Sequence, residues 1–362
     1  MHIPIQSYEM ESHICSDGWS SPEWSEKSGR TMANTKIIAV VLSLIIAFAV
    51  LGAVAWYEFA APKDGIPGTI SIIDDAGRNV TITSYPQKIV SLAPSTTELL
   101  FGVGLSDQTV GVVSYTGYST EIQNTIKDKN ITVVGTFNKV NVELAISLQP
   151  DLIVASGSYQ QSLAAKFTEQ GKTMIMLNPT KFSGILADIT LLGKVTGKDA
   201  NAATLLNSMQ SKAQEIVTKT RGLNKPSVYV EYYVNKDGYS SYGASSYVNE
   251  LIEMAGGVNV FANVTGQYIT TSPEEVLKAN PSIIIISKGV MSSLSGITPD
   301  SIRARPSWNN TSAVQNNKIY EVDEALLTIW GPRIVSGLEA LAQIIHPEVF
   351  NSTTALASNG TP

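Results

Sequence analysis

The chain has 362 residues, of which 43% are hydrophobic and 15% charged, with one cysteine, Cys15, and a formal net charge of −6. This composition excludes a disordered chain, a disulfide-stapled scaffold, an iron–sulfur cluster and a cysteine-based zinc site. An acidic balance without a basic run argues against a nucleic-acid partner, and the length allows two domains of about 100–200 residues each.

An apolar segment near the N-terminus predicts a membrane-spanning helix. Residues 37–57 are 21 consecutive uncharged residues, mostly Ile, Val, Leu and Ala, and as a helix they would cross a hydrocarbon core of roughly 30 Å. Lysine and arginine precede the segment, whereas Glu58 follows it at once. The positive-inside rule therefore places residues 1–36 in the cytoplasm and the rest of the chain on the extracytoplasmic side of the cell membrane.

Two alternatives remain open for this segment. Ala53-Val54-Ala55 has the form of a processing site, but the apolar run is longer than the roughly 7–15 residues of a cleaved signal, which favours an uncleaved, single-pass anchor. Met32, just before the apolar run, is an alternative start of the chain.

The residues after the anchor predict a linker over 58–68 and then an α/β lobe over 69–198. A hairpin is expected over Thr69–Thr83, and a strand over Lys88–Leu92 leads to a helix that Ser95 opens, with Glu98 at the capping-box position. Further strands alternate with helix-length segments such as 160–170, and the strands are expected at 110–113, 133–134, 152–155 and 174–177. Strands that alternate with helices predict a mostly parallel sheet.

A helix-rich stretch separates this lobe from the next. Residues 185–222 lack a strand pattern, and Ala200–Arg221 is rich in helix formers with apolar residues at helical spacing. We expect one connecting helix over 199–223. The pattern restarts after Pro226 with strands at 228–232 and 283–286 and helices at 247–254 and 274–279, which predicts a second α/β lobe over 224–350 before a flexible tail over 351–362.

The second half of the chain partly repeats the first. With an offset of 131 residues and no gap, Gly135 falls on Gly266, Phe137 on Tyr268, Glu143 on Glu274, Pro150 on Pro281, and Leu152–Ala155 on Ile283–Ile286. Each copy reads as a glycine turn, an aromatic residue, a short helix with a carboxylate in its first turn, and a buried strand. The repeat therefore predicts two lobes of like architecture.

The runs Ile89–Phe101, Gly111–Tyr115 and Val142–Ile153 resemble the cobalamin and ferric-siderophore binding proteins of ABC importers. The resemblance covers about residues 69–346. It implies two Rossmann-like lobes joined by one long backbone helix, with the ligand in the cleft between them. It also implies a monomer that delivers a small molecule to an ABC permease dimer with its ATPase subunits.

In that family one glutamate on each lobe docks into the permease. Carried over to this chain, the docking residues are Glu143 and Glu274, the pair that the repeat already places at equivalent positions. An alternative is that each acid only stabilises a helix start, which the macrodipole favours by about 0.3–1 kcal/mol. Ser272 and Glu275 would complete an ordinary capping box beside Glu274.

The ligand is expected to contact loops at the carboxyl ends of the strands. Aromatic residues placed there offer flat contact area with a polar tip, although any one such residue alone more often packs in the core or on the surface. The candidates are Tyr115, Phe137 and Tyr159 in the first lobe, Tyr239, Tyr242 and Tyr268 in the second, and Trp330 and Arg333. The segment Trp330–Arg333 resembles one that ends near the cleft in this family, so Trp330 is expected to stack on the ligand and Arg333 to contact an anionic group.

Cobalamin is the preferred cargo, mainly on the Ser114-Tyr115 and Trp330 segments, and no resident cofactor or metal is expected. Phe137 and Tyr268 stand where cobalamin binders of the family often carry tryptophan, and Ser119 stands where proline is usual. A ferric siderophore or haem is therefore the alternative. A haem would need an axial Tyr, His or Met from the cleft.

We do not expect an enzyme. The sequence has no P-loop, G-x-S-x-G or H-E-x-x-H string, and its three histidines lie close to the two ends. Glu143 and Glu274 are expected on separate lobes, too far apart for the paired acids of a glycosidase. A surface adhesion or assembly protein with the same fold is the remaining alternative.

Overall fold

The computed structural model describes residues 68–350, and of Ser158 the backbone alone. The cytoplasmic segment 1–36, the anchor 37–57, most of the linker and the tail 351–362 lie outside the described residues. Among residues 68–350, no helix is both long and apolar enough to cross a bilayer.

The N-terminal lobe, residues 69–198, is built on a six-stranded sheet of order β6-β5-β4-β3-β7-β8. All neighbouring strands are parallel except β5 and β6, and the predicted hairpin is confirmed as the antiparallel pair β1–β2. The elements are β1 (Ile70–Ile73), β2 (Asn79–Ile82), β3 (Ile89–Ser91), α2 (Pro94–Gly102), β4 (Thr109–Ser114), α3 (Thr120–Asp128), β5 (Thr132–Thr136), β6 (Lys139–Val140), α4 (Val142–Ser147), β7 (Leu152–Ser156), α5 (Gly157–Gln160), α6 (Leu163–Glu169), β8 (Thr173–Leu177) and α7 (Phe182–Thr196).

One predicted helix start is wrong. Helix α2 begins at Pro94 with Ala93 as its N-cap, so Ser95 lies inside the helix and Glu98 is not a capping residue. Proline suits the first helical position because its missing N–H would lack a partner there. The Thr96 hydroxyl accepts the Ala93 N–H over 3.2 Å, which leaves the Glu98 carboxylate for another partner.

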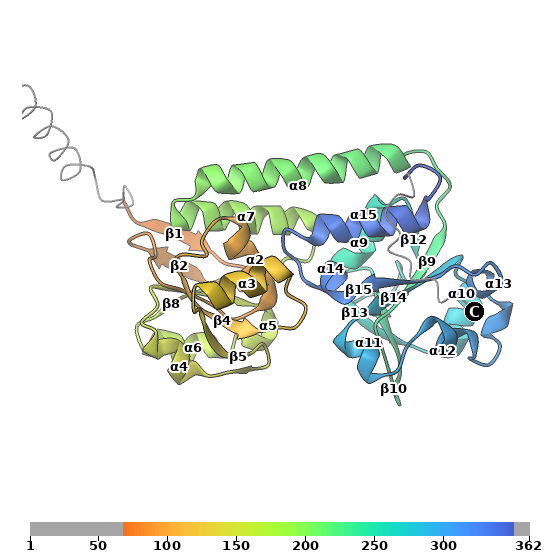
Figure 1. Cartoon of the computed structure of the whole chain (residues 1–362), viewed down its shortest axis with the longest axis horizontal. Helices are drawn as coiled ribbons and strands as arrows, with labels where there is room; N and C mark the ends of the chain where they lie inside the picture. Colours follow the sequence, from red (N-terminus) through yellow and green to blue (C-terminus); the bar gives the residue numbers. More distant parts are fainter. Residues whose placement is uncertain (1–67, 351–362) are drawn as a thin grey trace, which may run out of the picture. The chain divides into compact units, whose positions relative to one another are not determined.

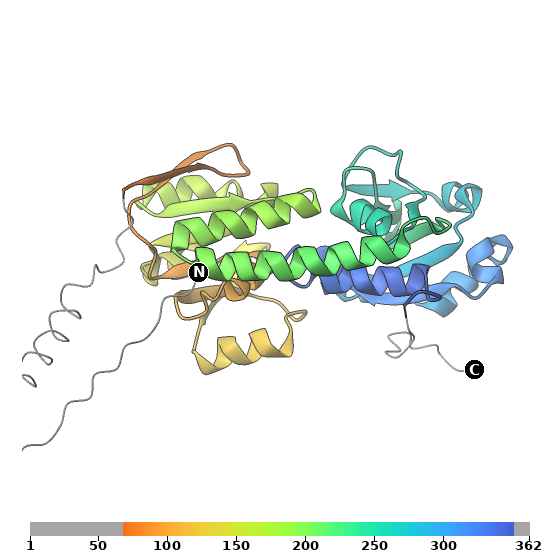
Figure 2. The same ribbon diagram turned by 90° about the horizontal axis from the view of Figure 1, so that it is seen from above.

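A 22-residue helix, α8 (Asp199–Thr220), occupies the predicted connecting segment. It runs beside α7 and, further along, beside α15 (Ile334–Ile345) and α9 (Tyr247–Met254), as Figures 1 and 2 show. At 1.5 Å per residue it is about 33 Å long. The helix is therefore long enough to pack against both halves of the described chain.

The C-terminal lobe, residues 224–350, contains a parallel sheet of order β12-β9-β14-β15 and a separate antiparallel sheet of order β10-β11-β13. The sequence pattern missed the antiparallel sheet. Besides α9 and α15, the elements are β9 (Ser227–Glu231), β10 (Tyr233–Asn235), β11 (Gly238–Tyr242), β12 (Val258–Asn259), β13 (Tyr268–Thr271), α10 (Pro273–Ala279), β14 (Ile283–Lys288), α11 (Val290–Leu294), α12 (Pro299–Arg303), a 3₁₀ turn (Trp308–Asn310), α13 (Ser312–Gln315), β15 (Ile319–Asp323) and α14 (Glu324–Thr328).

The internal repeat has a structural counterpart. Helices α4 and α10 begin 131 residues apart, at Val142 and Pro273, and strands β7 and β14 begin with the same offset. Gly135 and Gly266 both have positive φ, +119° and +131°, a region that glycine enters without steric cost. The repeat thus corresponds to the helices α4 and α10 and to the strands β7 and β14, which lie in two different sheets, whereas Tyr268 opens β13 of the antiparallel sheet.

One hydrophobic core joins the lobes. It contains Leu152 and Val154 of β7, Met209 and Ile216 of α8, and Val228 of β9, all nearly or fully buried. Ile153 and Ala155 of β7 face a separate core on the other side of the N-terminal sheet, since successive side chains of a strand point to opposite faces. Both faces of this sheet are covered, as a parallel sheet requires.

Candidate functional site

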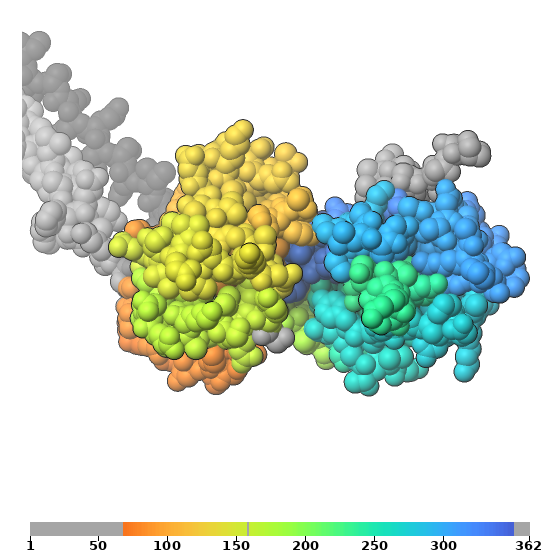
Figure 3. Space-filling model, turned by 90° about the horizontal axis from the view of Figure 1, so that it is seen from below, coloured from red at the N-terminus to blue at the C-terminus, as the bar shows by residue number. Residues whose placement is uncertain are grey.

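A cavity of about 800 Å³ lies between the two lobes (Figure 3). The N-terminal lobe lines it with residues that follow the carboxyl ends of its strands, where open α/β sheets bind their ligands. The C-terminal lobe contributes segments after β14 and β15 and from α9 and β13. The lining is Ala93–Ser95, Ser114–Thr116, Thr136–Asn138, Ser156, Gly157, Tyr159, Asn178, Pro179, Tyr247, Gln267, Tyr268, Val290, Met291, Glu324 and Thr328–Trp330.

A second cavity of about 990 Å³ adjoins the main one. Both are lined by Tyr115, Thr116, Val290 and Glu324, so they form one continuous cleft. Val290 is 51% exposed, which gives the cleft an apolar edge on the side of α11. Each cavity by itself is at the upper end of the roughly 300–1,000 Å³ of ordinary ligand pockets.

Five of the eight predicted ligand residues line the main cavity: Tyr115, Phe137, Tyr159, Tyr268 and Trp330. Phe137 and Tyr159 pack with ring centroids 6.1 Å apart, and the Tyr159 hydroxyl donates to the Asn138 carbonyl oxygen over 2.8 Å. Ring packing and this hydrogen bond therefore fix the two rings together on the N-terminal side of the cavity. Tyr268 belongs to β13 and is 56% exposed, so its ring is available from the C-terminal side.

Tyr242 lies behind the cavity rather than in it. Its side chain is 1% exposed and packs against the rings of Tyr232 and Tyr268, 5.0 and 5.8 Å away between centroids. Burial raises the pKa of Tyr242 well above its usual value, so the hydroxyl stays protonated. The buried ring of Tyr242 therefore supports the exposed ring of Tyr268.

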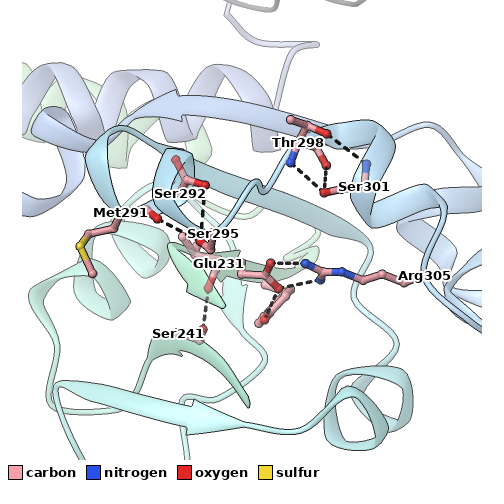
Figure 4. A network of polar contacts seen from close by, with 10 residues as sticks. Glu231, Ser241, Met291, Ser292, Ser295, Thr298, Ser301 and Arg305 are labelled. Atoms are coloured by element: carbon pink, nitrogen blue, oxygen red, sulfur yellow. Dashed lines mark hydrogen bonds and ion pairs between the residues drawn. The ribbon is translucent and has the colours of Figure 1, made fainter. Parts of the chain in front are cut away.

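Tyr239 packs on the far side of the C-terminal lobe core. Its ring covers the Arg305 guanidinium at 4.4 Å and meets Trp308 edge-on at 5.7 Å. Arg305 in turn donates to both carboxylate oxygens of the buried Glu231, over 2.9 and 2.6 Å (Figure 4). This charge-assisted, bidentate ion pair holds Arg305 in place, and Tyr239 packs against Arg305 and not against the cavity.

Arg333 does not line either cavity and has another partner. Its Nε donates to Oε1 of Glu98 in α2 over 3.0 Å, and its Nη2 donates to the same oxygen and to the Gly117 carbonyl oxygen. Its charge is thus matched within the protein. The sequence pattern missed this pair because Glu98 reads locally as a capping residue.

The cleft carries negative charge. Among the described residues that line the main cavity, Glu324 is the one charged side chain. In the second cavity Lys288 pairs with Glu321 over 2.7 Å, while the Asp323 carboxylate caps α14 through the Ala325 N–H. Burial, together with the carboxylates of Glu324 and Asp323, raises the pKa of Tyr115 to about 12. Tyr115 is therefore a neutral hydrogen-bond donor.

Polar groups that the sequence analysis did not single out also face the main cavity. Asn138, Asn178 and Gln267 bring amide groups, and Tyr247 and Met291 add a further ring and a thioether. Asn138, Asn178 and Met291 follow the carboxyl ends of β5, β8 and β14, so the placement rule could also have found these three. Within residues 68–350, no group of three or more His, Cys, Asp or Glu is arranged to hold a metal ion.

The two predicted docking glutamates occupy matching positions. Glu143 is the second residue of α4 and Glu274 the second residue of α10, and both are exposed. The neighbouring Glu275 closes the capping box with Ser272 and also accepts the Thr271 hydroxyl. Within residues 68–350, no hydrogen-bond or ion-pair partner engages Glu143 or Glu274.

Comparison with known proteins agrees with this architecture. A periplasmic binding protein family model matches residues 89–326. The chain is 33% identical over 288 residues to an uncharacterized ABC transporter substrate-binding lipoprotein, YvrC, of Bacillus subtilis. This alignment covers 78% of this chain and 87% of YvrC. The chain is also 25% identical over 277 residues to the cobalamin-binding protein of Halobacterium salinarum, covering 75% and 73% of the two chains.

A solved structure shows the same fold. The apo periplasmic heme-binding protein RhuT from Roseiflexus sp. RS-1 matches with a TM-score of 0.63 and 22% identity, over 73% of this chain and 99% of that one. At this identity the likeness concerns the fold alone. On the family match and the Bacillus relative together, this chain belongs to the periplasmic binding protein family and is a substrate-binding protein of an ABC importer, a class of solute-binding proteins rather than enzymes.

Proposed function

We propose that this protein binds cobalamin in the interlobe cleft and carries it to the permease of its importer. The observation that carries the proposal is the chemistry of the main cavity, which combines aromatic faces from both lobes with amide and hydroxyl groups and no cationic side chain among the described lining residues. A corrin is a flat, bulky ring with a rim of amide groups. Aromatic faces suit the ring, and Asn138, Asn178 and Gln267 suit its amides.

The charge of the cleft disfavours the alternative cargoes. Ferric catecholates and haem are anionic and call for lysine or arginine, but Lys288 is paired with Glu321, and Arg333 with Glu98. Burial and the neighbouring carboxylates raise the pKa of Tyr115, which disfavours Tyr115 as an axial tyrosinate for haem. The Halobacterium relative, named a cobalamin-binding protein, supports the same choice.

The cargo is tested by titrating the full chain, kept in detergent, with cobalamin, a ferric tris-catecholate and haem. We expect cobalamin alone to bind below about 1 μM, a free energy of about −8 kcal/mol. Replacing Tyr268 by Ala should weaken cobalamin binding about tenfold, or about 1.4 kcal/mol. The control Tyr233→Ala, on the same antiparallel sheet but outside the cavity lining, should leave it unchanged. Binding of an iron complex without cobalamin would refute the proposal.

Glu143 and Glu274 are proposed to dock the protein onto the permease. Their support is the combination of equivalent position, exposure and lack of a partner within the described chain, in contrast to the capping acid Glu275. Two like charges on equivalent helices fit a partner of two similar subunits, because complementary charges steer encounter and fix orientation.

The docking is tested with Glu143→Gln/Glu274→Gln and the reconstituted importer. Stimulation of the ATPase by the protein should be lost, while cobalamin affinity stays at the wild-type value. Glu121→Gln/Glu169→Gln removes the same charge from exposed sites on α3 and α6 and serves as the control. Equal stimulation by wild type and the docking variant would contradict the assignment.

We further propose that residues 37–57 hold the protein on the outer face of the membrane. The Bacillus relative is named a lipoprotein, but the one cysteine of this chain, Cys15, precedes the apolar run. Resistance of the full chain to alkaline extraction, lost on deleting residues 37–57, would support this anchor. Extraction of both forms alike would argue against it.

A further inference from the structure

The segment that leads from the cleft into α15 is fastened to the opposite lobe by one ion pair. Arg333 reaches the Glu98 carboxylate of α2 through Nε and Nη2, and the Gly117 carbonyl oxygen through Nη2 over 2.8 Å. The Glu98 side chain is 1% exposed and that of Arg333 24%. One guanidinium thus joins α2, the loop after β4 and the segment before α15.

Each of the two segments joined by this guanidinium contributes an aromatic residue to the lining of the cleft. Tyr115 lies two residues before Gly117, and Trp330 lies three residues before Arg333, and both rings line the main cavity. Tyr115 folds over Gly117 so closely that a Cβ added there would lie 2.6 Å from the ring. The guanidinium therefore ties the Tyr115 loop of one lobe to the Trp330 segment of the other.

The fit around the pair leaves little freedom. A Cβ on Gly331 would come within 3.0 Å of the Glu98 side chain, and a Cβ on Gly102 within 2.7 Å of the Pro332 ring. Residues 331–333 are thus seated directly on α2. Contacts this close transmit a displacement instead of absorbing it, because packed interiors are not continuously deformable.

Stability alone does not explain the pair. Replacing a buried ion pair by apolar residues of similar size is often neutral or stabilising. Here Oε2 of Glu98 is buried without a hydrogen-bond partner among the described residues, which carries a desolvation cost. Burial also raises the pKa of Glu98 against the opposing effect of Arg333. Unlike an apolar pair, the ion pair fixes the relative orientation of the two side chains, because the donors of a guanidinium form a rigid fork.

We propose that Glu98 and Arg333 are positioning residues that set the spacing of Tyr115 and Trp330 across the cleft, and so determine cargo affinity without touching the cargo. The affinity part of this statement rests on the proposed cobalamin binding. The positioning part does not, because the environment of Trp330 can be measured without ligand.

The chain offers a matched control in Glu231 and Arg305. This pair is also a buried glutamate with an arginine, but both residues belong to the C-terminal lobe and Arg305 stacks on Trp308, 4.6 Å from its ring centroid. Trp308 does not line either cavity. Breaking this pair should disturb the surroundings of Trp308 and leave the cleft as it is.

The test labels the full chain with 5-fluorotryptophan, which gives five ¹⁹F resonances, and assigns Trp308 and Trp330 by Trp→Phe variants. In Glu98→Leu/Arg333→Met the Trp330 resonance should shift or broaden without ligand, and cobalamin should dissociate about tenfold faster. In Glu231→Leu/Arg305→Met only the Trp308 resonance should change. Should the first variant fail to fold, Arg333→Lys retains the charge but loses the fork and should give the same two changes.

Two results would overturn the proposal: an unchanged Trp330 resonance in the folded Glu98→Leu/Arg333→Met variant, or equal acceleration of dissociation by both double variants. If wild type binds no cobalamin, the proposed function fails, and the ligand-free Trp330 resonance still decides the positioning role.

Discussion

At the residue scale, the role of a charged side chain in this protein depends on contacts with residues far along the chain more than on the local sequence. Glu98 and Arg333 are 235 residues apart, and no local pattern relates them, so the sequence assigned the glutamate to a helix cap and the arginine to the ligand. In contrast, the rule that ligands contact loops at strand ends gave four aromatic residues that line the main cavity, and the family resemblance gave Trp330. Tyr239 and Tyr242 were expected in loops but lie within β11, where their rings pack against Trp308 and Tyr232, respectively.

Asp188 offers a prediction at this scale. It is 5% exposed, and its Oδ2 is buried without a partner among the described residues. Burial, with a smaller effect of the Asp75 carboxylate, raises the pKa of Asp188 to about 8. Since its unfolded pKa is about 3.9, the folded state holds the proton more tightly, and the free energy of unfolding should fall as pH rises from about 4 to 8.

The variant Asp188→Asn should remove this fall. Its melting temperature should exceed that of wild type by several degrees at pH 8 and match it near pH 4. Thermal unfolding at both pH values measures the difference, with the exposed Asp128→Asn as a control for net charge. Identical pH profiles of wild type and Asp188→Asn would show that Asp188 ionises freely in the folded protein.

At the element scale, long and buried strands were readable and short exposed ones were not. The parallel strands β7 and β14 are runs of buried aliphatic residues, the pattern of a sheet covered on both faces. Strands β10 and β13 have three and four residues with mixed burial, which leaves too few alternations to recognise. The loop between β10 and β11 is Lys236-Asp237, and the Asp237-Gly238 pair that leads into β11 was an available hairpin signal.

Helix α15 provides the prediction at this scale. Gly337 lies in its interior, where Ala would favour the helix by about 1 kcal/mol. A Cβ at this position, however, would lie 2.1 Å from the Leu326 carbonyl oxygen of α14. We expect Gly337→Ala to lower the free energy of unfolding by about 1–3 kcal/mol through overpacking. Urea unfolding measures the change.

The exposed neighbour Ser336→Ala is the matched control, since it improves helix propensity without meeting α14. It should leave stability unchanged or slightly raised. A stabilising Gly337→Ala would mean that α14 and α15 separate easily.

At the scale of the whole molecule, the sequence predicted two similar α/β lobes through the repeat, and two separate parallel sheets are found. It could not predict that one core runs through both lobes, because this depends on how α8, α7 and α15 pack. The Phe182 N–H at the start of α7 also donates to Glu250 of α9 over 2.6 Å, a second polar link between the lobes.

A shared core predicts joint unfolding. We expect calorimetry to show one transition for residues 68–350, with equal calorimetric and van't Hoff enthalpies. The proposed ligand, cobalamin, should shift that transition as a whole. Two resolved transitions, of which cobalamin moves only one, would show that the lobes are thermodynamically independent.

The continuous core along α8 has a consequence for how ligand-free and ligand-bound protein compete for the importer. Because one core runs through both lobes, we expect the lobes to move little on ligand binding, and the ligand-free form should therefore also occupy the permease. Ligand-free protein should then compete with ligand-bound protein for the transporter, so that uptake slows when the binding protein greatly outnumbers its ligand.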